Sequence, residues 1–161
     1  MKKLFIFIYV VLAVLLTSYI CSKFTHIGLV GWYNNIDKPK LTPPNIVFPI
    51  AWSIIYTLIM VSTYVALRDS NKKLRNKVNN TFLIQLLLQI LWCFSFFAEG
   101  QIGFALAVVL LLGFSVFKMI SIFLQINKLS GFLLYPYYWW VIFATFLNAV
   151  FVASKGMIIV F

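Results

Sequence analysis

Five long apolar runs divide this chain and limit the folds open to it more than any other feature. They cover about residues 4–22, 47–67, 79–98, 101–126 and 130–154. A helix that crosses a bilayer needs about 20 mostly apolar residues, and it satisfies its own backbone groups, as lipid requires. We therefore predict an all-α integral membrane protein, a single domain over residues 1–161 built as a bundle of five transmembrane helices.

The composition supports a lipid environment. Of the 161 residues 63% are hydrophobic and only 10% are charged, whereas soluble domains carry about a quarter of charged residues. The net charge of +10 would suggest nucleic acid in a soluble protein. Here the basic residues sit mostly between the apolar runs, where they orient helices and contact anionic headgroups. We therefore exclude nucleic acid and expect the lipid bilayer as a partner.

The basic residues also predict an orientation. The N-terminus, residues 68–78 and residues 127–129 should share one side, which then carries eight basic residues against four on the other. The positive-inside rule places that side, and the N-terminus, in the cytoplasm. The Lys-rich start has no presequence pattern, and the first run lacks a small-x-small cleavage site, so we expect a retained helix in a bacterial plasma membrane. The eight are Lys2, Lys3, Arg68, Lys72, Lys73, Arg75, Lys77 and Lys128; the four are Lys23, Lys38, Lys40 and Lys155.

Residues 23–46 form the longest connection between the predicted helices. Pro39, Pro43 and Pro44 disfavour helix and push the residues before them toward extended conformations. We predict a rigid loop that caps one end of the bundle.

Aromatic and amide side chains recur at helical spacing on three of the runs. Amides are costly toward lipid, so Gln85, Gln89 and Asn148 should point into the bundle and bring the aromatic residues of the same face with them. Two interpretations fit: a pocket for a flat apolar ligand with a few polar substituents, or amides that bond across helices while Trp fills space. Helices one and four show no comparable polar face and should meet lipid or a partner chain. The three faces are Trp52 and Tyr56; Gln85, Gln89 and Trp92; Trp140, Ala144 and Asn148.

The residues of this sequence offer little support for a catalytic function. The three acidic residues and His26 are scattered over predicted loops and turns, so they form no acid–base pair, metal site or activated nucleophile. Cys21 and Cys93 have no paired spacing and are interpreted as small buried hydrophobes. We predict no metal, no cofactor and no assured catalytic residue.

Five stretches carry a resemblance to a known family. Residues 32–39 (WYNNIDKP), the PP at 43–44 and residues 48–56 (FPIAWSIIY) resemble the patterns WYxxLxKPxxxPPxxxF and VWTxLY of the TspO/MBR family. These are the tryptophan-rich sensory proteins related to the mitochondrial translocator protein, or peripheral benzodiazepine receptor. Residues 85–92 (QLLLQILW) resemble QLxLNxxW, and residues 133–148 (LLYPYYWWVIFATFLN) resemble LLxPYxxWxxFAxxLN.

The resemblance implies a five-helix bundle, often a homodimer, that binds porphyrins such as protoporphyrin IX and other flat apolar ligands under the first long loop. By motif match Trp52 and Trp140 flank the pocket and are linked to light-dependent porphyrin breakdown. Ala144 is tied to ligand and sterol affinity, although Phe151 stands where the sterol pattern wants Tyr. Gln89 replaces the family's Asn and lengthens a pocket amide by one methylene.

We therefore predict a membrane receptor or carrier for tetrapyrroles, serving transport, sensing or porphyrin homeostasis. One alternative is an enzyme-like light-dependent porphyrin degradation with Trp52 and Trp140 as electron donors. Another is a signalling or scaffold subunit whose partners recognise the basic residues 68–77. The predicted ligand-binding residues are Tyr33, Pro44, Trp52, Tyr56, Gln89, Trp92, Trp140, Ala144 and Asn148.

Overall fold

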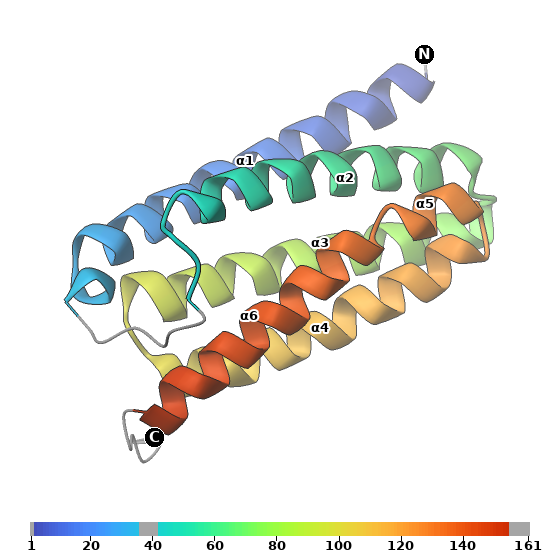
Figure 1. Ribbon diagram of the computed structural model, residues 1–161. Coiled ribbons are helices and arrows are strands. Elements are labelled where there is room, and N and C mark those ends of the chain that lie inside the picture. The colour runs from blue at the N-terminus through green and yellow to red at the C-terminus, as the bar shows by residue number, and fades with distance from the viewer. Residues whose placement is uncertain (1, 36–41, 155–161) are drawn as a thin grey trace.

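The computed structural model describes residues 2–35 and 42–154, and within them the chain consists of helices joined by short turns, with no strand (Figure 1). Five helical stretches of the described chain are long and apolar enough to cross a membrane, which confirms the predicted all-α membrane fold. Pro39, Lys38, Lys40 and Lys155, on which parts of the cap and charge predictions rest, lie outside the described residues. The elements are α1 (Lys2–Val30), η1 (Trp32–Asn34), α2 (Val47–Asp69), α3 (Lys72–Cys93), η2 (Phe94–Ala98), α4 (Ile102–Leu124), α5 (Lys128–Phe132) and α6 (Tyr135–Ser154).

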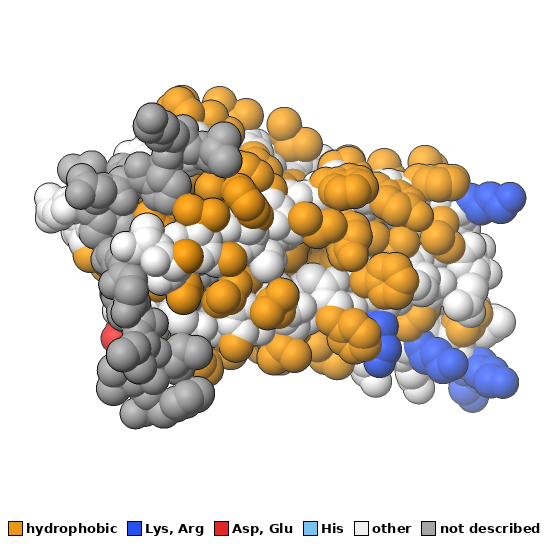
Figure 2. Space-filling model, turned by 60° about the horizontal axis from the view of Figure 1, so that its bottom comes forward, with side chains coloured by type: hydrophobic (Ala, Val, Ile, Leu, Met, Phe, Trp, Pro, Cys, Tyr) orange, Lys and Arg blue, Asp and Glu red, His pale blue; other side chains and the backbone are white. Residues whose placement is uncertain are grey.

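The helices close into a ring. Going round the bundle, α1 packs on α2, α2 on α6, α6 on α4, α4 on α3, and α3 again on α1, while α2 also contacts α3. Figure 1 shows the long axes running side by side, with the N-terminus and the α2–α3 and α4–α5 turns at the same end. The face in Figure 2 has an apolar belt, with Lys and Arg gathered at this end. Which side of a membrane this end faces stays a prediction.

The first helix is longer than predicted and continues to Val30 instead of ending near residue 22. The last turns of α1 carry polar side chains, and the helix continues through them because these side chains have local partners. The Ser22 hydroxyl donates to the carbonyl of Tyr19 at 2.7 Å, and the Lys23 ammonium lies 5.2 Å from the centre of the Tyr19 ring. His26 therefore lies on a helix and not in the capping loop.

The third helix begins at Lys72, where the sequence suggested a loop as far as residue 78. Asn71 is the reason, because its side chain accepts a hydrogen bond from the backbone N–H of Leu74 at 2.9 Å and caps the helix. All five basic residues predicted for this loop are thus helical, Arg68 at the end of α2 and the other four in α3. The last span is interrupted between α5 and α6, next to Pro136, which cannot donate a backbone hydrogen bond to the preceding turn.

Polar side chains join the helices inside the bundle. Gln85, Gln89 and Asn148 are each at most 1% exposed, which confirms that these amides point inward. The Ser62 hydroxyl donates to the carbonyl of Ser130 at 2.6 Å and connects α2 to α5. Each such bond spares a polar group from lipid.

A close approach between two backbone segments fixes the C-terminal end of α1. Gly28 lies so near η2 that a Cβ at this position would stand 2.7 Å from the carbonyl oxygen of Phe97. Only glycine allows the two backbones to come this close. Trp32 strengthens the same junction, since its indole N–H donates to that Phe97 carbonyl at 2.8 Å.

We expect Gly28→Ala to lower the thermal stability of the purified protein in detergent, by about 1–3 kcal/mol, because the added methyl group forces α1 and η2 apart. Gly113→Ala is the matched control: its Cβ would meet Val141 at an ordinary 3.6 Å, and alanine favours helix. Equal melting temperatures for Gly28→Ala and the parent would contradict the close approach.

Candidate functional site

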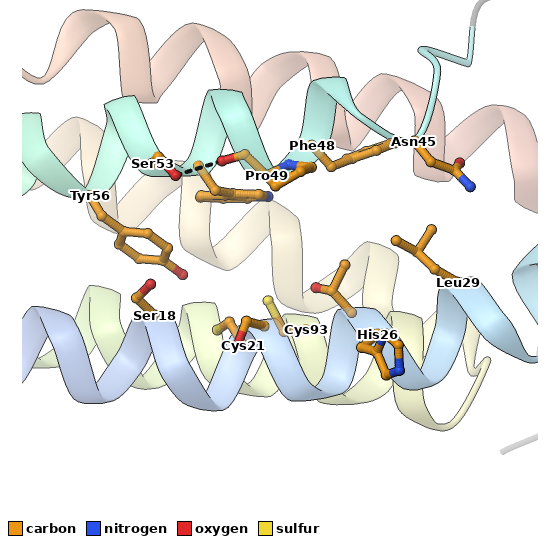
Figure 3. Close-up of a pocket in the computed structure, with 13 residues that line it drawn as sticks. Ser18, Cys21, His26, Leu29, Asn45, Phe48, Pro49, Ser53, Tyr56 and Cys93 are labelled. Carbon is orange, nitrogen blue, oxygen red and sulfur yellow. Dashed lines mark hydrogen bonds between the residues drawn. The ribbon is translucent and has the colours of Figure 1, made fainter.

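A pocket of about 270 Å³ lies between α1 and α2, with its inner end at α3 (Figure 3). It occupies the half of the bundle that carries the first connection. Its lining residues are Ser18, Cys21, Ser22, Thr25, His26 and Leu29 of α1, Asn45 just before α2, Phe48, Pro49, Trp52, Ser53 and Tyr56 of α2, and Cys93 of α3.

The two long walls of this pocket differ in chemistry. The α2 wall is aromatic, because Phe48, Trp52 and Tyr56 follow one another at intervals of four residues and so share one face. The α1 wall carries small hydroxyl groups and a thiol at helical spacing, with Ser18, Ser22 and Thr25 among them. A flat apolar molecule with a polar edge fits such an arrangement.

The α1 wall was not predicted from the sequence, which showed no comparable polar face on the first helix and led us to expect contact with lipid or a partner chain there. Its outer face does expose apolar residues such as Leu12 and Leu16. The signal was present in the recurrence of small polar residues at Ser18, Ser22 and Thr25, every three to four positions. Each is short enough to bond to its own helix, so this pattern alone does not distinguish a pocket wall from a lipid-facing helix.

Trp52 of α2 lies against both Trp92 of α3 and Trp140 of α6. Its ring centroid is 6.2 Å from that of Trp92 and 6.2 Å from that of Trp140. Tyr56 lies on its other side at 5.5 Å. Of the three indoles only that of Trp52 lines the pocket, with the other two behind it.

The amides predicted to bind ligand have their partners within the protein. Asn148 donates through Nδ2 to the carbonyl of Ile102 at 2.8 Å and accepts from the indole N–H of Trp92 at 3.4 Å. The Gln89 Oε1 atom accepts from the hydroxyl of Tyr137 at 3.2 Å. Ala144 is partly buried and packs against the core. None of these three predicted residues lines the pocket.

Tyr33 and Pro44 flank the first connection. Tyr33, on η1, is 1% exposed and packs among four phenylalanine rings at centroid distances of 5.8–6.4 Å. Burial raises the pKa of its phenol to about 12, so this side chain is neutral at physiological pH. Pro44 is exposed, and its carbonyl accepts from the N–H of Val47 where α2 begins.

The fold and the site define a multi-pass integral membrane protein of five spanning helices with an aromatic pocket between two of them. A family model described as the TspO/MBR family matches residues 7–153. The chain therefore belongs to the TspO/MBR family.

Named relatives support this assignment. The chain is 33% identical to the "Tryptophan-rich protein TspO" of Archaeoglobus fulgidus over 86% of its own length and 89% of the relative. It is 35% identical to "Protein CrtK" of Rhodobacter capsulatus, over 73% and 74%. It is also 30% identical to the human "Translocator protein", over 85% and 82%.

Two buried tyrosines allow a matched test of the site. The Tyr137 hydroxyl donates to Gln85 at 3.0 Å and to Gln89, whereas the Tyr56 hydroxyl, at the pocket wall, makes no well-formed hydrogen bond. We expect Tyr137→Phe to destabilise the protein by about 1–3 kcal/mol, since it strips buried acceptors of their donor. Tyr56→Phe should leave the melting temperature unchanged or raise it. The reverse order in thermal unfolding would refute this assignment of partners.

Proposed function

We propose that this protein is a membrane receptor or carrier that binds tetrapyrroles and other flat apolar ligands in the pocket between α1 and α2. The proposal rests on one observation: the aromatic wall of α2 lies opposite a row of small hydroxyl groups on α1. The names of two relatives, "Tryptophan-rich sensory protein" and "Translocator protein", agree with a role in sensing or transport.

In this proposal the ligand stacks on Trp52. The indole is a suitable platform because Trp92 and Trp140 hold it from behind and Tyr56 from the side. A platform that is already ordered loses little conformational freedom on binding. The polar edge of the ligand faces α1, where hydroxyl groups and the His26 imidazole can donate hydrogen bonds.

A whole tetrapyrrole requires the pocket to widen. The volume of about 270 Å³ lies just below the roughly 300–1,000 Å³ typical of sites for drug-sized ligands, and a substituted macrocycle is larger than this space. The first turn of α2 is the element best able to yield, because no side chain caps it. The C-terminal end of α1 is instead fixed where Gly28 packs against η2.

The remaining predicted residues take supporting roles in this proposal. Trp92, Trp140 and the amides hold the platform, and Ala144 lies one turn beyond Trp140 on α6. Light-dependent porphyrin degradation is a second candidate, favoured by the contact between Trp52 and Trp140, which would place two oxidisable indoles beside an excited ligand. Homodimer formation and sterol binding stay predictions from the family resemblance.

We expect the affinity for protoporphyrin IX, followed in the dark by the absorbance of the porphyrin, to fall at least about tenfold in Trp52→Leu, a loss of about 1.4 kcal/mol. Trp139→Leu is the matched control, since Trp139 is 64% exposed on the outer face of α6, and it should bind like the parent. Equal affinities for both variants would refute stacking on Trp52.

Two further variants locate the ligand. Ser22→Phe fills the pocket from the α1 wall and should abolish binding, because a phenyl ring would take the space that the ligand needs. Ala144→Phe should weaken binding less, since Ala144 does not line the pocket. Loss of binding in Ala144→Phe with full binding in Ser22→Phe would move the site to α6. Illumination of the complex then separates receptor from enzyme: an unchanged porphyrin favours the receptor, and a product that disappears in Trp140→Phe favours degradation.

A further inference from the structure

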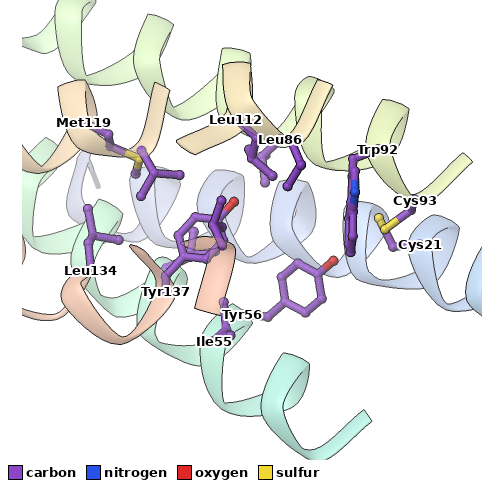
Figure 4. Packing of buried hydrophobic residues seen from close by; sticks show 14 of the residues in the cluster. Cys21, Ile55, Tyr56, Leu86, Trp92, Cys93, Leu112, Met119, Leu134 and Tyr137 are labelled. Carbon is purple, nitrogen blue, oxygen red and sulfur yellow. The ribbon is translucent and has the colours of Figure 1, made fainter. Parts of the chain in front are cut away.

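Two cysteines that lie far apart in the sequence meet at the inner end of the pocket. Cys21 of α1 and Cys93 of α3 both line it, both are free thiols, and they are 4% and 1% exposed. Figures 3 and 4 show the two side chains next to each other from different directions. The chain contains no other cysteine.

The surroundings hold both sulfur atoms against one residue. The Cys21 thiol donates to the backbone carbonyl of Gln89 at 3.8 Å, and the Cys93 sulfur accepts from Gln89 Nε2 at 3.6 Å. The pair is thus positioned by α3 and not by chance contact of two mobile side chains. Because both cysteines line the pocket, a molecule that enters the pocket lies next to them without unfolding of the bundle.

We propose that Cys21 and Cys93 form a redox-active dithiol, oxidised to a disulfide by an organic hydroperoxide that enters the pocket. An apolar hydroperoxide suits this site because most of the lining is carbon and the surrounding phase is lipid. The disulfide would join α1 to α3 at the inner end of the pocket.

The reaction balances in two steps. The Cys21 sulfur attacks the peroxide oxygen, the O–O bond breaks, and the alkoxide takes the thiol proton to leave as an alcohol, with Cys21 as a sulfenic acid. The Cys93 sulfur then attacks that sulfur and displaces hydroxide, which leaves as water with the Cys93 proton. Two thiols lose two electrons, and the hydroperoxide gains them.

Tyr56 is placed to assist the first step. Its hydroxyl points toward Cys21 from the opposite wall and makes no well-formed hydrogen bond of its own. It can therefore donate to the departing oxygen without breaking an existing bond. In this proposal Tyr56 is a catalytic residue for the oxidation of Cys21, because its hydroxyl contacts the departing oxygen.

The test counts thiols in the purified full-length protein. After treatment with cumene hydroperoxide, the chain is unfolded and labelled with a maleimide polymer, whose attachments are counted on a non-reducing gel. We expect the parent to lose both labels as a monomer and dithiothreitol to restore both. Retention of both labels, loss of only one, or loss through a cross-linked dimer would each overturn the proposal.

Three variants sharpen the result. Cys21→Ala with Ser18→Cys moves one thiol about a helical turn along the same wall, beyond the Cβ separation of about 3.5–4.5 Å that a disulfide needs, and should lose its labels severalfold more slowly. Tyr56→Phe should slow the loss in the parent without changing its extent. In Cys93→Ala, dimedone should trap a sulfenic acid at Cys21, and absence of this adduct would contradict the order of the steps.

A second reagent tests the pairing without an oxidant. Phenylarsine oxide forms two S–As bonds with a close dithiol and releases water, so the parent should bind one equivalent and either single alanine variant none. Equal binding by parent and variants would overturn the pairing. Neither measurement uses a tetrapyrrole, so both outcomes are independent of the proposed ligand.

Discussion

The hydroxyl of Tyr137, whose single hydrogen lies between the amide oxygens of Gln85 and Gln89, is the contact on which the interior of this bundle depends. It joins α6 to α3 across the centre, between side chains that are buried in the bundle, where leaving a polar group without a partner is costly. Gln89 then reaches Cys93 through its amide nitrogen and Cys21 through its backbone carbonyl. One polar chain thus extends from α6 through α3 to α1 and ends at the pocket wall.

This row of hydrogen-bonded side chains explains why the pocket lies between α1 and α2. The amide oxygens of Gln85 and Gln89 on α3 accept from Tyr137 of α6, and the amide oxygen of Asn148 on α6 accepts from Trp92 of α3, so these side chains fill the space between the two helices. The gap remains between α1 and α2, where small residues such as Ser18 and Ser22 face the rings of α2. The amides that helical spacing assigned to ligand binding therefore hold helices together. The wall that faces the pocket is formed instead by small polar residues of α1, which can bond to their own helix.

The sequence predicted the parts of the fold that depend on length and face. Apolar runs of about 20 residues located the five spans, and the cost of amides in lipid placed Gln85, Gln89 and Asn148 inside. Trp52 and Tyr56 also share the predicted face, and both line the pocket. Helical spacing identifies a face but not the helix that it meets. The neighbourhood of Cys21 and Cys93 depends on tertiary packing, and the extension of α1 to Val30 depends on local partners that a hydropathy pattern does not reveal.

The π-helical segment η2 sets a limit on how the chain can vary in length. A π turn holds one residue more than an α turn, and here it brings three consecutive residues, Ser95, Phe96 and Phe97, inside the bundle. Removal of one residue would turn the following chain by about 100° and carry Phe97 away from Gly28. The five residues of η2 therefore tolerate substitution by other apolar side chains more readily than insertion or deletion. Among members of the family, the number of residues in this turn should vary less than the number at the chain ends.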